Sequence, residues 1–354
     1  MNPRRSFFKT VLKLTGAAAF SRPAKTEAPG LSVVTPDIAG LPFTIDNGVK
    51  VFQLTAEPVK QAVVPGRTLD LWGFNGSAPG PTIQVAEGDR VRILFANHLP
   101  EPTGIHWHGL EIPYEMDGVP GIGQKPVAPG ERFVYEFTVR QNGTFFYHSH
   151  MAMQEMVGML GGFVVHPKVP YTPAVDKDYL IALQEYFVLP SSTVPNSMNM
   201  EFNWLTFNGK AGPAATPLII RLGERVRIRL INLGMDHHPI HLHGFTFWET
   251  GREGARQPES LWNRGNTVLV GVAQARDIEF IADRPGEWMF HCHLPHHMMN
   301  HMAPVVGPMT RVGPGIERSQ VPLFPQDAYM EGPMMAMDNA VSKPETHGLP
   351  AGCA

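Results

Sequence analysis

The sequence has few cysteines, few charged residues and no long apolar run, and each shortage excludes a class of protein. Its 354 residues include only two cysteines, Cys292 and Cys353, which are too few for a disulfide framework. Charged residues make up 17% of the chain and the formal net charge is −3, which argues against nucleic acid or an anionic membrane surface as a partner. A membrane-spanning helix would need a run of about 20 apolar residues, and the sequence has none.

Glycine and proline are abundant by contrast. The chain has 35 glycines and 34 prolines. Their combined share of the residues is above the average of about 12% but below the roughly 25–30% of low-complexity chains. Alternating runs such as VRILFANH, RFVYEFTV, VRIRLIN and RDIEFIAD end at Gly, Pro, Asp or Asn, which is typical of short strands joined by turns. We therefore expect an all-β fold of the sandwich or barrel type.

The N-terminus begins MNPRRSFFKTVLKLTGAAAF, where Arg4 and Arg5 precede a weakly apolar run. This order resembles a twin-arginine export signal. The run is too short, and too often broken by Lys9 and Lys13, to span a bilayer. We expect residues 1–28 to be a signal peptide of a bacterial protein that is periplasmic or secreted.

The chain contains two copies of one pattern. FNGSAPGPTIQ is matched by FNGKAGPAATPLII, EGDRVRILFANHLPEPTGIHWHG by LGERVRIRLINLGMDHHPIHLHG, and NGTFFYHSHMAMQEMVGM by PGEWMFHCHLPHHMMNHM. The offset of about 135 residues is far longer than a solenoid or propeller unit and indicates duplication of a whole domain. We expect a first copy at 40–168 and a second copy at 178–312, followed by a tail at 313–354 that contains Pro and Met.

An H-x-H pattern occurs four times among the sixteen histidines, whereas random placement would give about 0.7 such pairs. Residues i and i+2 of a strand face the same side, so each pair directs two imidazoles to one place. Eight converging imidazoles imply a metal cluster, although imidazole suits copper, zinc, iron and nickel alike. Buried core histidines and a closed zinc site are the alternatives, and both fit this number of pairs poorly. The pairs are His106 and His108, His148 and His150, His241 and His243, and His291 and His293.

Cys292 identifies the metal more narrowly. It lies between two cluster histidines but points to the opposite face of the strand, so it would serve a separate metal close to the cluster. His238 opens the HPIHLHG motif, and His297 and Met302 follow Cys292. Two histidines, one thiolate and a weak methionine form the ligand set of a blue-copper electron-transfer centre.

The first copy provides an internal control. At the positions of His238, Cys292, His297 and Met302 the repeat places Thr103, Ser149, Gln154 and Met159. Three of the four ligands are absent there. We expect blue copper in the second copy alone, while both copies keep their cluster histidines.

These motifs resemble those of the multicopper oxidases of the two-domain, small-laccase type. HWHG, HSH, HPIHLHG and HCHLPHHMMNHM match that family's copper motifs in order. The resemblance implies two cupredoxin-like Greek-key β-sandwich domains and four copper ions per chain. It assigns His238, Cys292, His297 and Met302 to type 1 copper, His106 and His241 to type 2 copper, and His108, His148, His150, His243, His291 and His293 to the type 3 pair.

The resemblance also implies the activity. A laccase-like oxidase couples one-electron oxidation of a phenolic or aromatic substrate to four-electron reduction of dioxygen to water, with His297 accepting the electron and Cys292 relaying it. Two-domain relatives assemble as homotrimers, with each cluster shared between the first domain of one chain and the second domain of the next. Asp117 matches an acidic residue near the cluster and is a candidate proton carrier; the alternative is a turn-forming Asp before Gly118.

Three other functions stay open at this stage. Methionines near the copper motifs and in YMEGPMMAM are soft ligands that select Cu(I), which favours a cuprous oxidase for periplasmic copper tolerance; gap-filling core methionine is the alternative. A copper nitrite reductase is also a two-domain trimer, but its blue copper belongs in the first domain. A non-enzymatic copper-binding protein would not need Cys292 between two histidines.

Overall fold

The computed structural model describes residues 31–294 except 152, 190, 191, 201 and 213, together with residue 297 and the backbone of two short strands. These two strands, β20 (Val305–Val306) and β21 (Val341–Ser342), pair antiparallel. The expected signal peptide, Met302, Cys353 and most of the C-terminal tail lie outside the described residues. Within the described part, no helix is long and apolar enough to cross a membrane.

The predicted all-β class is confirmed, since strands make up 50% of the structure and helices 4%. Between residues 31 and 294 the helices of the described chain are single 3-10 turns, at η1 (Tyr114–Met116), η2 (Glu155–Val157) and η3 (Glu259–Leu261). Connections between strands are otherwise turns and loops, as the high glycine and proline content indicates.

The first copy forms two facing sheets. One has the order β1-β2-β5-β7, with β3 paired to β2, and the other has the order β4-β9-β8-β6. Alternate residues of β5 are buried, and they pack with aromatic side chains of β6, β7, β8 and β9 in one core. The strands are β1 (Phe43–Asp46), β2 (Val49–Val64), β3 (Arg67–Phe74), β4 (Gly80–Ala86), β5 (Arg90–Asn97), β6 (Ile105–His108), β7 (Arg132–Thr138), β8 (Gly143–Ser149) and β9 (Leu160–His166).

The second copy repeats this plan. Its larger sheet has the order β11-β10-β12-β18-β14-β15, with β16 on β14, and its smaller sheet is β17-β13-β19. The parallel pair β10–β12 aligns Leu183 with Asn232, just as the parallel pair β2–β5 aligns Ala56 with Asn97. The strands are β10 (Lys177–Tyr186), β11 (Trp204–Phe207), β12 (Arg225–Asn232), β13 (His238–Leu242), β14 (Phe247–Arg252), β15 (Ala255–Arg256), β16 (Asn263–Gly265), β17 (Thr267–Val270), β18 (Gln274–Ile281) and β19 (Phe290–Cys292).

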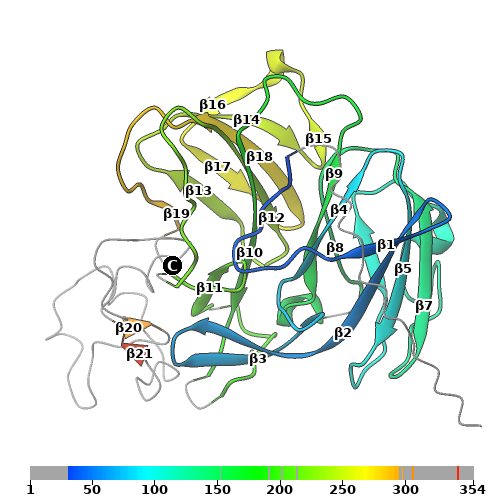
Figure 1. Cartoon of the computed structure of the whole chain (residues 1–354). Helices are drawn as coiled ribbons and strands as arrows, with labels where there is room; N and C mark the ends of the chain where they lie inside the picture. The colour runs from blue at the N-terminus through cyan, green and yellow to red at the C-terminus, as the bar shows by residue number, and fades with distance from the viewer. Residues whose placement is uncertain are drawn as a thin grey trace, which may run out of the picture.

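The two copies pack against each other through apolar contacts. In Figure 1 the strands of the first copy, blue to green, lie beside those of the second, green to orange. The hairpin β2–β3 reaches across, and its Val63 and Leu69 share a buried cluster with Tyr186 and Trp204 of the second copy. A second shared cluster joins β8 and β9 to β10 and β12. The β6–β8 and β13–β19 strand pairs, which carry the histidine motifs, are thereby fixed in one framework.

Candidate copper sites

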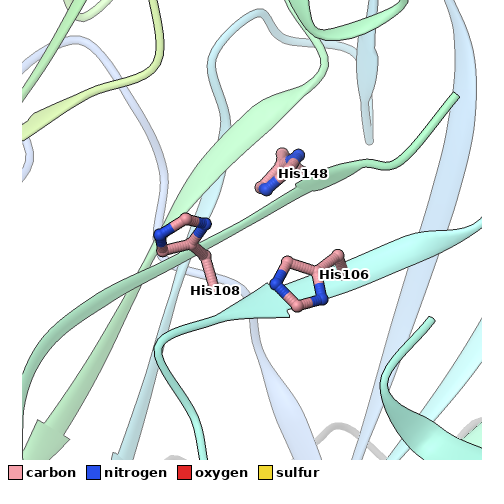
Figure 2. Close-up of side chains that lie close together, drawn as sticks. All are labelled: His106, His108 and His148. Carbon is pink, nitrogen blue, oxygen red and sulfur yellow. The ribbon is translucent and has the colours of Figure 1, made fainter. Parts of the chain in front are cut away.

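The histidines of the first copy gather where β6 and β8 pair. His106 and His108 lie on one face of β6, and His106 is the direct cross-strand partner of His148 on β8. Their three imidazoles point toward one another (Figure 2), with the ring of His106 centred 5.4 Å from that of His148 and 5.6 Å from that of His108. His150, just beyond β8, places its ring 5.5 Å from that of His106. The sequence-predicted residues of this half of the cluster are therefore together.

Hydrogen bonds orient two of these rings. Nδ1 of His106 lies 2.8 Å from the carbonyl oxygen of Asp117, and Nδ1 of His148 lies 2.7 Å from the carbonyl oxygen of Ser149. A carbonyl only accepts, so each Nδ1 carries the hydrogen and donates it, and each Nε2 keeps its lone pair. Nε2 of His148 is buried and has no hydrogen-bond partner among the described residues. An unpartnered nitrogen aimed into a group of imidazoles fits a metal ligand.

The second copy has the same arrangement on β13 and β19. His241 is the cross-strand partner of His291, and Nε2 of His243 lies 3.0 Å from Nε2 of His291. Nδ1 of His291 donates to the carbonyl of its neighbour Cys292 at 2.7 Å, and Nδ1 of His241 donates to the carbonyl of Asn266 at 2.7 Å. The ring of His293 is centred 5.5 Å from that of His241.

The surroundings keep several of these imidazoles neutral. Burial lowers the pKa of His106, His243 and His291, and neighbouring imidazoles lower each further. Burial, together with nearby His148 and His106, lowers the pKa of His108 to about 4. A metal binds the neutral form of imidazole, so these groups are in the form that binding requires.

The two histidine groups do not contact each other within the described chain. Every ring contact between cluster histidines joins members of the same copy. His150 and His293 are exposed, although a cluster ligand would be expected to be covered. Each chain thus presents two half-sites.

Beside the second half-site lies a separate group of three buried donors. One ring nitrogen of His238, one of His297 and the sulfur of Cys292 lie within 4.8 Å of one another. All three residues are buried. Burial lowers the pKa of His238, but the neighbouring Cys292 and Glu185 raise it by more, to about 9. The pocket therefore stabilises a positive charge, which a bound copper ion would supply in place of the second ring proton of His238, and its nitrogen and sulfur donors suit copper.

The equivalent place in the first copy is filled by hydrogen bonds. The hydroxyls of Thr103 and Ser149 are 3.0 Å apart, and the Ser149 hydroxyl donates to the Gln154 side-chain oxygen at 2.6 Å. The Gln154 amide donates to the carbonyl of Pro102 at 3.0 Å. Their polar atoms satisfy one another without a metal. In the second copy, by contrast, Nδ1 of His238 has no nitrogen or oxygen partner among the described residues.

Only one of the carboxylates near the predicted ligands was expected from the sequence. That one is Asp117, and its Oδ1 lies 3.4 Å from Nδ1 of His106. Sequence reasoning missed Glu155, 3.1 Å from Nδ1 of His148, Asp236, 3.3 Å from Nε2 of His297, and Glu185, 3.0 Å from Nε2 of His238. Asp236 precedes His238 by two positions and could have been flagged by proximity. Glu185 lies far along the chain from every histidine motif, so no sequence spacing pointed to it.

Comparison with known proteins supports the same interpretation. Two multicopper oxidase family profiles match residues 57–170 and 187–308. Copper resistance protein A of Pseudomonas syringae pv. tomato is 35% identical over 188 residues, covering 52% of this chain and 29% of that protein. Laccase-3 of Botryotinia fuckeliana is 32% identical over 226 residues, covering 58% of this chain and 48% of that protein. The chain thus spans less than half of these two curated relatives.

Solved structures extend the similarity to the fold. The blue copper oxidase from Nitrosomonas europaea superposes with a TM-score of 0.65 at 32% identity, covering 70% of this chain and 80% of that one. The match therefore includes most of a solved oxidase rather than one motif, and the predicted cupredoxin-like fold is confirmed. Taken with the paired histidine motifs and the two profile matches, this shows that the chain belongs to the multicopper oxidase family.

Proposed function

We propose that this protein is a copper-dependent, laccase-like oxidase that couples one-electron oxidation of a small reducing substrate to the four-electron reduction of dioxygen to water. The observation that carries the proposal is Cys292, buried with two histidines on one side and flanked in the chain by two cluster histidines. Copper held by these residues would supply the one-electron chemistry. The twin-arginine-like N-terminus supports a periplasmic or secreted location.

Each copper ion is assigned to a group of the histidine, cysteine and methionine side chains described above. His238, Cys292 and His297 would hold type 1 copper, with Met302, which lies outside the described residues, as the weak fourth ligand. Type 2 copper would be held by His106 and His241. The type 3 pair would be held by His108, His148 and His150 from the first copy and by His243, His291 and His293 from the second. Four ions per chain result from this assignment.

Cys292 links the two kinds of site through the covalent chain. Its peptide neighbours His291 and His293 point to the opposite face of the strand, so one residue separates the thiolate from either imidazole. A short bonded path between an electron-accepting site and an oxygen-binding site limits the time that a partly reduced oxygen species would persist. Cys292 would thus relay the electrons that enter at His297.

The separation of the half-sites supports a homotrimer. The first-copy histidines and the second-copy histidines share no ring contact within the chain, and His150 and His293 are exposed. A closed ring of three chains would bring the first half-site of one chain against the second half-site of the next. Each such interface would then complete one cluster.

Asp117 would hold protons for water formation. Its carboxylate lies 3.4 Å from Nδ1 of His106 and is 40% exposed, so it contacts both a ligand and solvent. The backbone carbonyl of the same residue accepts the hydrogen of that Nδ1 at 2.8 Å, which fixes the ring and leaves the carboxylate available for proton transfer.

The reducing substrate is either phenolic or Cu(I). Met198, Met200 and Met235 are exposed, and Met235 adjoins Asp236, whose carboxylate lies 3.3 Å from His297. Thioethers are soft ligands that select Cu(I), so exposed methionines in this part of the chain suit a cuprous substrate. The name of the relative, copper resistance protein A, agrees with this second candidate, a cuprous oxidase for copper tolerance.

The proposal is tested by oxygen uptake of the copper-loaded protein with Cu(I) and, separately, with a methoxyphenol. Cys292→Ser should lose the blue colour and abolish uptake with both substrates, whereas Cys353→Ser, at the chain's other cysteine, should keep both. Uptake with Cu(I) alone would select the cuprous oxidase. Nitrite consumption without oxygen uptake would select a nitrite reductase, and copper binding without either reaction would indicate a non-enzymatic copper protein.

A further inference from the structure

We propose that Glu185 is a positioning residue that presents His238 to copper in the correct tautomer and lowers the reduction potential of the type 1 site. The inference rests on the proposed function in one respect, namely that His238 is a copper ligand. Glu185 lies on β10, outside every copper motif, and its side chain is fully buried.

The carboxylate of Glu185 meets three N–H donors. Its Oε2 lies 3.0 Å from Nε2 of His238. Its Oε1 accepts the backbone N–H of Asp236 at 2.8 Å and also that of Met235. The carboxylate therefore holds both the imidazole and the loop that leads into it. A buried acidic group needs such partners, because an unpaired charge in the interior is costly.

This geometry determines which nitrogen of His238 can bind a metal. A carboxylate only accepts hydrogen bonds, so Nε2 of His238 carries the hydrogen and Nδ1 keeps its lone pair. Nδ1 is the nitrogen without a nitrogen or oxygen partner among the described residues. One ring nitrogen of His238 lies within 4.8 Å of the Cys292 sulfur. The donor that remains is thus available to a metal beside the thiolate.

The loop before β13 leaves room for the carboxylate of Glu185 because residue 234 is a glycine. A Cβ atom on Gly234 would lie 2.1 Å from Oε2 and 2.2 Å from Oε1 of Glu185. No side chain fits there while Glu185 keeps its three bonds. Gly234 is held in place by its own N–H, which donates to the Asn232 side chain at 2.8 Å. Glycine at 234 and glutamate at 185 therefore form a matched pair.

The first copy lacks this pair, as it lacks the three donors. The parallel registers of β2–β5 and β10–β12 make Pro58 the equivalent of Glu185. The N–H groups of Leu99 and Gly234 both donate to the corner asparagine of their copy, so Leu99 is the equivalent of Gly234. The carboxylate thus occurs only in the copy that has Cys292. A residue needed only for the sandwich fold would be expected in both copies, and not only in the copy that has the proposed copper ligands.

A negative charge next to a ligand favours the more positive oxidation state of the metal. In a buried site this effect is little screened by solvent. Glu185 should accordingly favour Cu(II) over Cu(I) and lower the potential at which the site accepts an electron. Hydrogen bonding from the ligand also raises its basicity and strengthens metal binding.

Glu185→Gln in the copper-loaded full chain tests the inference. Glutamine has one acceptor oxygen; if that oxygen keeps the two backbone N–H groups, its amide faces His238 and favours the tautomer with hydrogen on Nδ1. We expect type 1 copper affinity to fall by about tenfold to a hundredfold. We also expect the Cu(I) to Cu(II) ratio at fixed potential to rise about tenfold, which corresponds to a midpoint about 59 mV higher. Both are followed on the blue absorption band of Cu(II), the potential by redox titration and the affinity by competition with a Cu(II) chelator.

Two further variants keep the result interpretable. Gly234→Ala should displace the carboxylate and change the affinity and potential in the same direction, even if the glutamine variant folds poorly. Glu279→Gln removes another buried carboxylate, one that pairs with Arg227 and Arg256, and should lower stability without moving the potential. If both Glu185→Gln and Gly234→Ala keep the copper affinity and the Cu(I) to Cu(II) ratio at fixed potential within twofold of wild type, the role of Glu185 is overturned. Absence of a blue band from wild type would instead overturn the copper assignment, and this inference with it.

Discussion

At the scale of single residues, the histidine rings are fixed by acceptors that are not themselves ligands. Backbone carbonyls accept the Nδ1 hydrogens of His106, His148, His241 and His291, at 2.7–2.8 Å. Because these acceptors belong to the backbone of the strands and their adjoining turns, the ring orientation is built into the fold. Binding a metal then requires little rearrangement of the ligands.

Asp117→Asn should slow the reduction of dioxygen while leaving the blue colour unchanged. Asparagine keeps the backbone carbonyl that orients His106 but cannot exchange a proton. A lost proton carrier typically costs about a hundredfold or more in rate. The reoxidation of fully reduced protein by dioxygen, followed by stopped flow, measures this step directly. Glu115→Gln, an exposed carboxylate on η1, is the matched control and should reoxidise at the wild-type rate.

The histidine pairs could be predicted from the sequence because the strand period places residues i and i+2 on one face. Cys292 could be assigned to a different site for the same reason. Glu185 could not be predicted, because it meets His238 through a contact between β10 and the start of β13. Sequence spacing carries no information on such a contact. The axial role of Met302 stays a prediction.

At the scale of elements, each copy has an asparagine corner at the end of a central strand. Asn97 ends β5, and its side-chain amide donates to the carbonyls of Glu101 and Val127, both at 2.8 Å. Asn232 ends β12 and donates to the carbonyls of Asp236 and Val270, at 2.8 and 3.1 Å. The corners are equivalent, but only the second leads to a proposed copper ligand, His238.

Asn232→Ala and Asn97→Ala should destabilise the protein alike and affect the blue copper differently. Each removes a buried amide and leaves backbone groups unpaired, at a cost of about 1–3 kcal/mol in the free energy of unfolding. Denaturant titration measures that cost. Only Asn232→Ala should also shift or weaken the blue band, because it releases the loop that carries His238. A change of equal size in the Asn97→Ala spectrum would contradict this account.

The strand order could be anticipated only in part. Alternation predicted β5, β7, β12 and β18 and hence an all-β fold. The long hairpin β2–β3 was not foreseen, since it is stabilised by Tyr186 and Trp204 of the other copy rather than by its own sequence pattern. Packing between distant segments determined this element, and local propensity did not.

At the scale of the whole molecule, a buried polar network joins the two copies. Arg229 of β12 pairs with Asp178 at 2.8 Å and also donates to the hydroxyl of Thr144, at 2.7 Å, across the interface. The Thr144 hydroxyl in turn donates to Asp277 at 2.7 Å. Burial raises the pKa of Asp277, and Arg229 opposes that shift. One threonine of the first copy therefore completes a charged network of the second.

Thr144→Val should weaken the joint between the copies. Valine has nearly the same shape but neither accepts from Arg229 nor donates to Asp277, so two buried charged groups each lose a partner. We expect a loss of about 1–3 kcal/mol in the free energy of unfolding, measured by denaturant titration. Thr138→Val, on the exposed end of β7, serves as the control and should be close to neutral. An equal loss of unfolding free energy in both variants would show that the hydrogen bonds of Thr144 contribute nothing to stability.

Subunit mixing tests the shared cluster. One variant lacks the first half-site, through His106→Ala and His108→Ala, and the other lacks the second, through His241→Ala and His243→Ala. Each alone should be inactive. If every cluster joins the first half-site of one chain to the second half-site of the next, coexpression should restore intact clusters at about one quarter of the interfaces, by random assembly in a closed trimer. Oxygen uptake of the coexpressed, copper-loaded protein, with copper content determined in parallel, measures the recovery. Clusters built within single chains would give none, because no chain in the mixture keeps both half-sites.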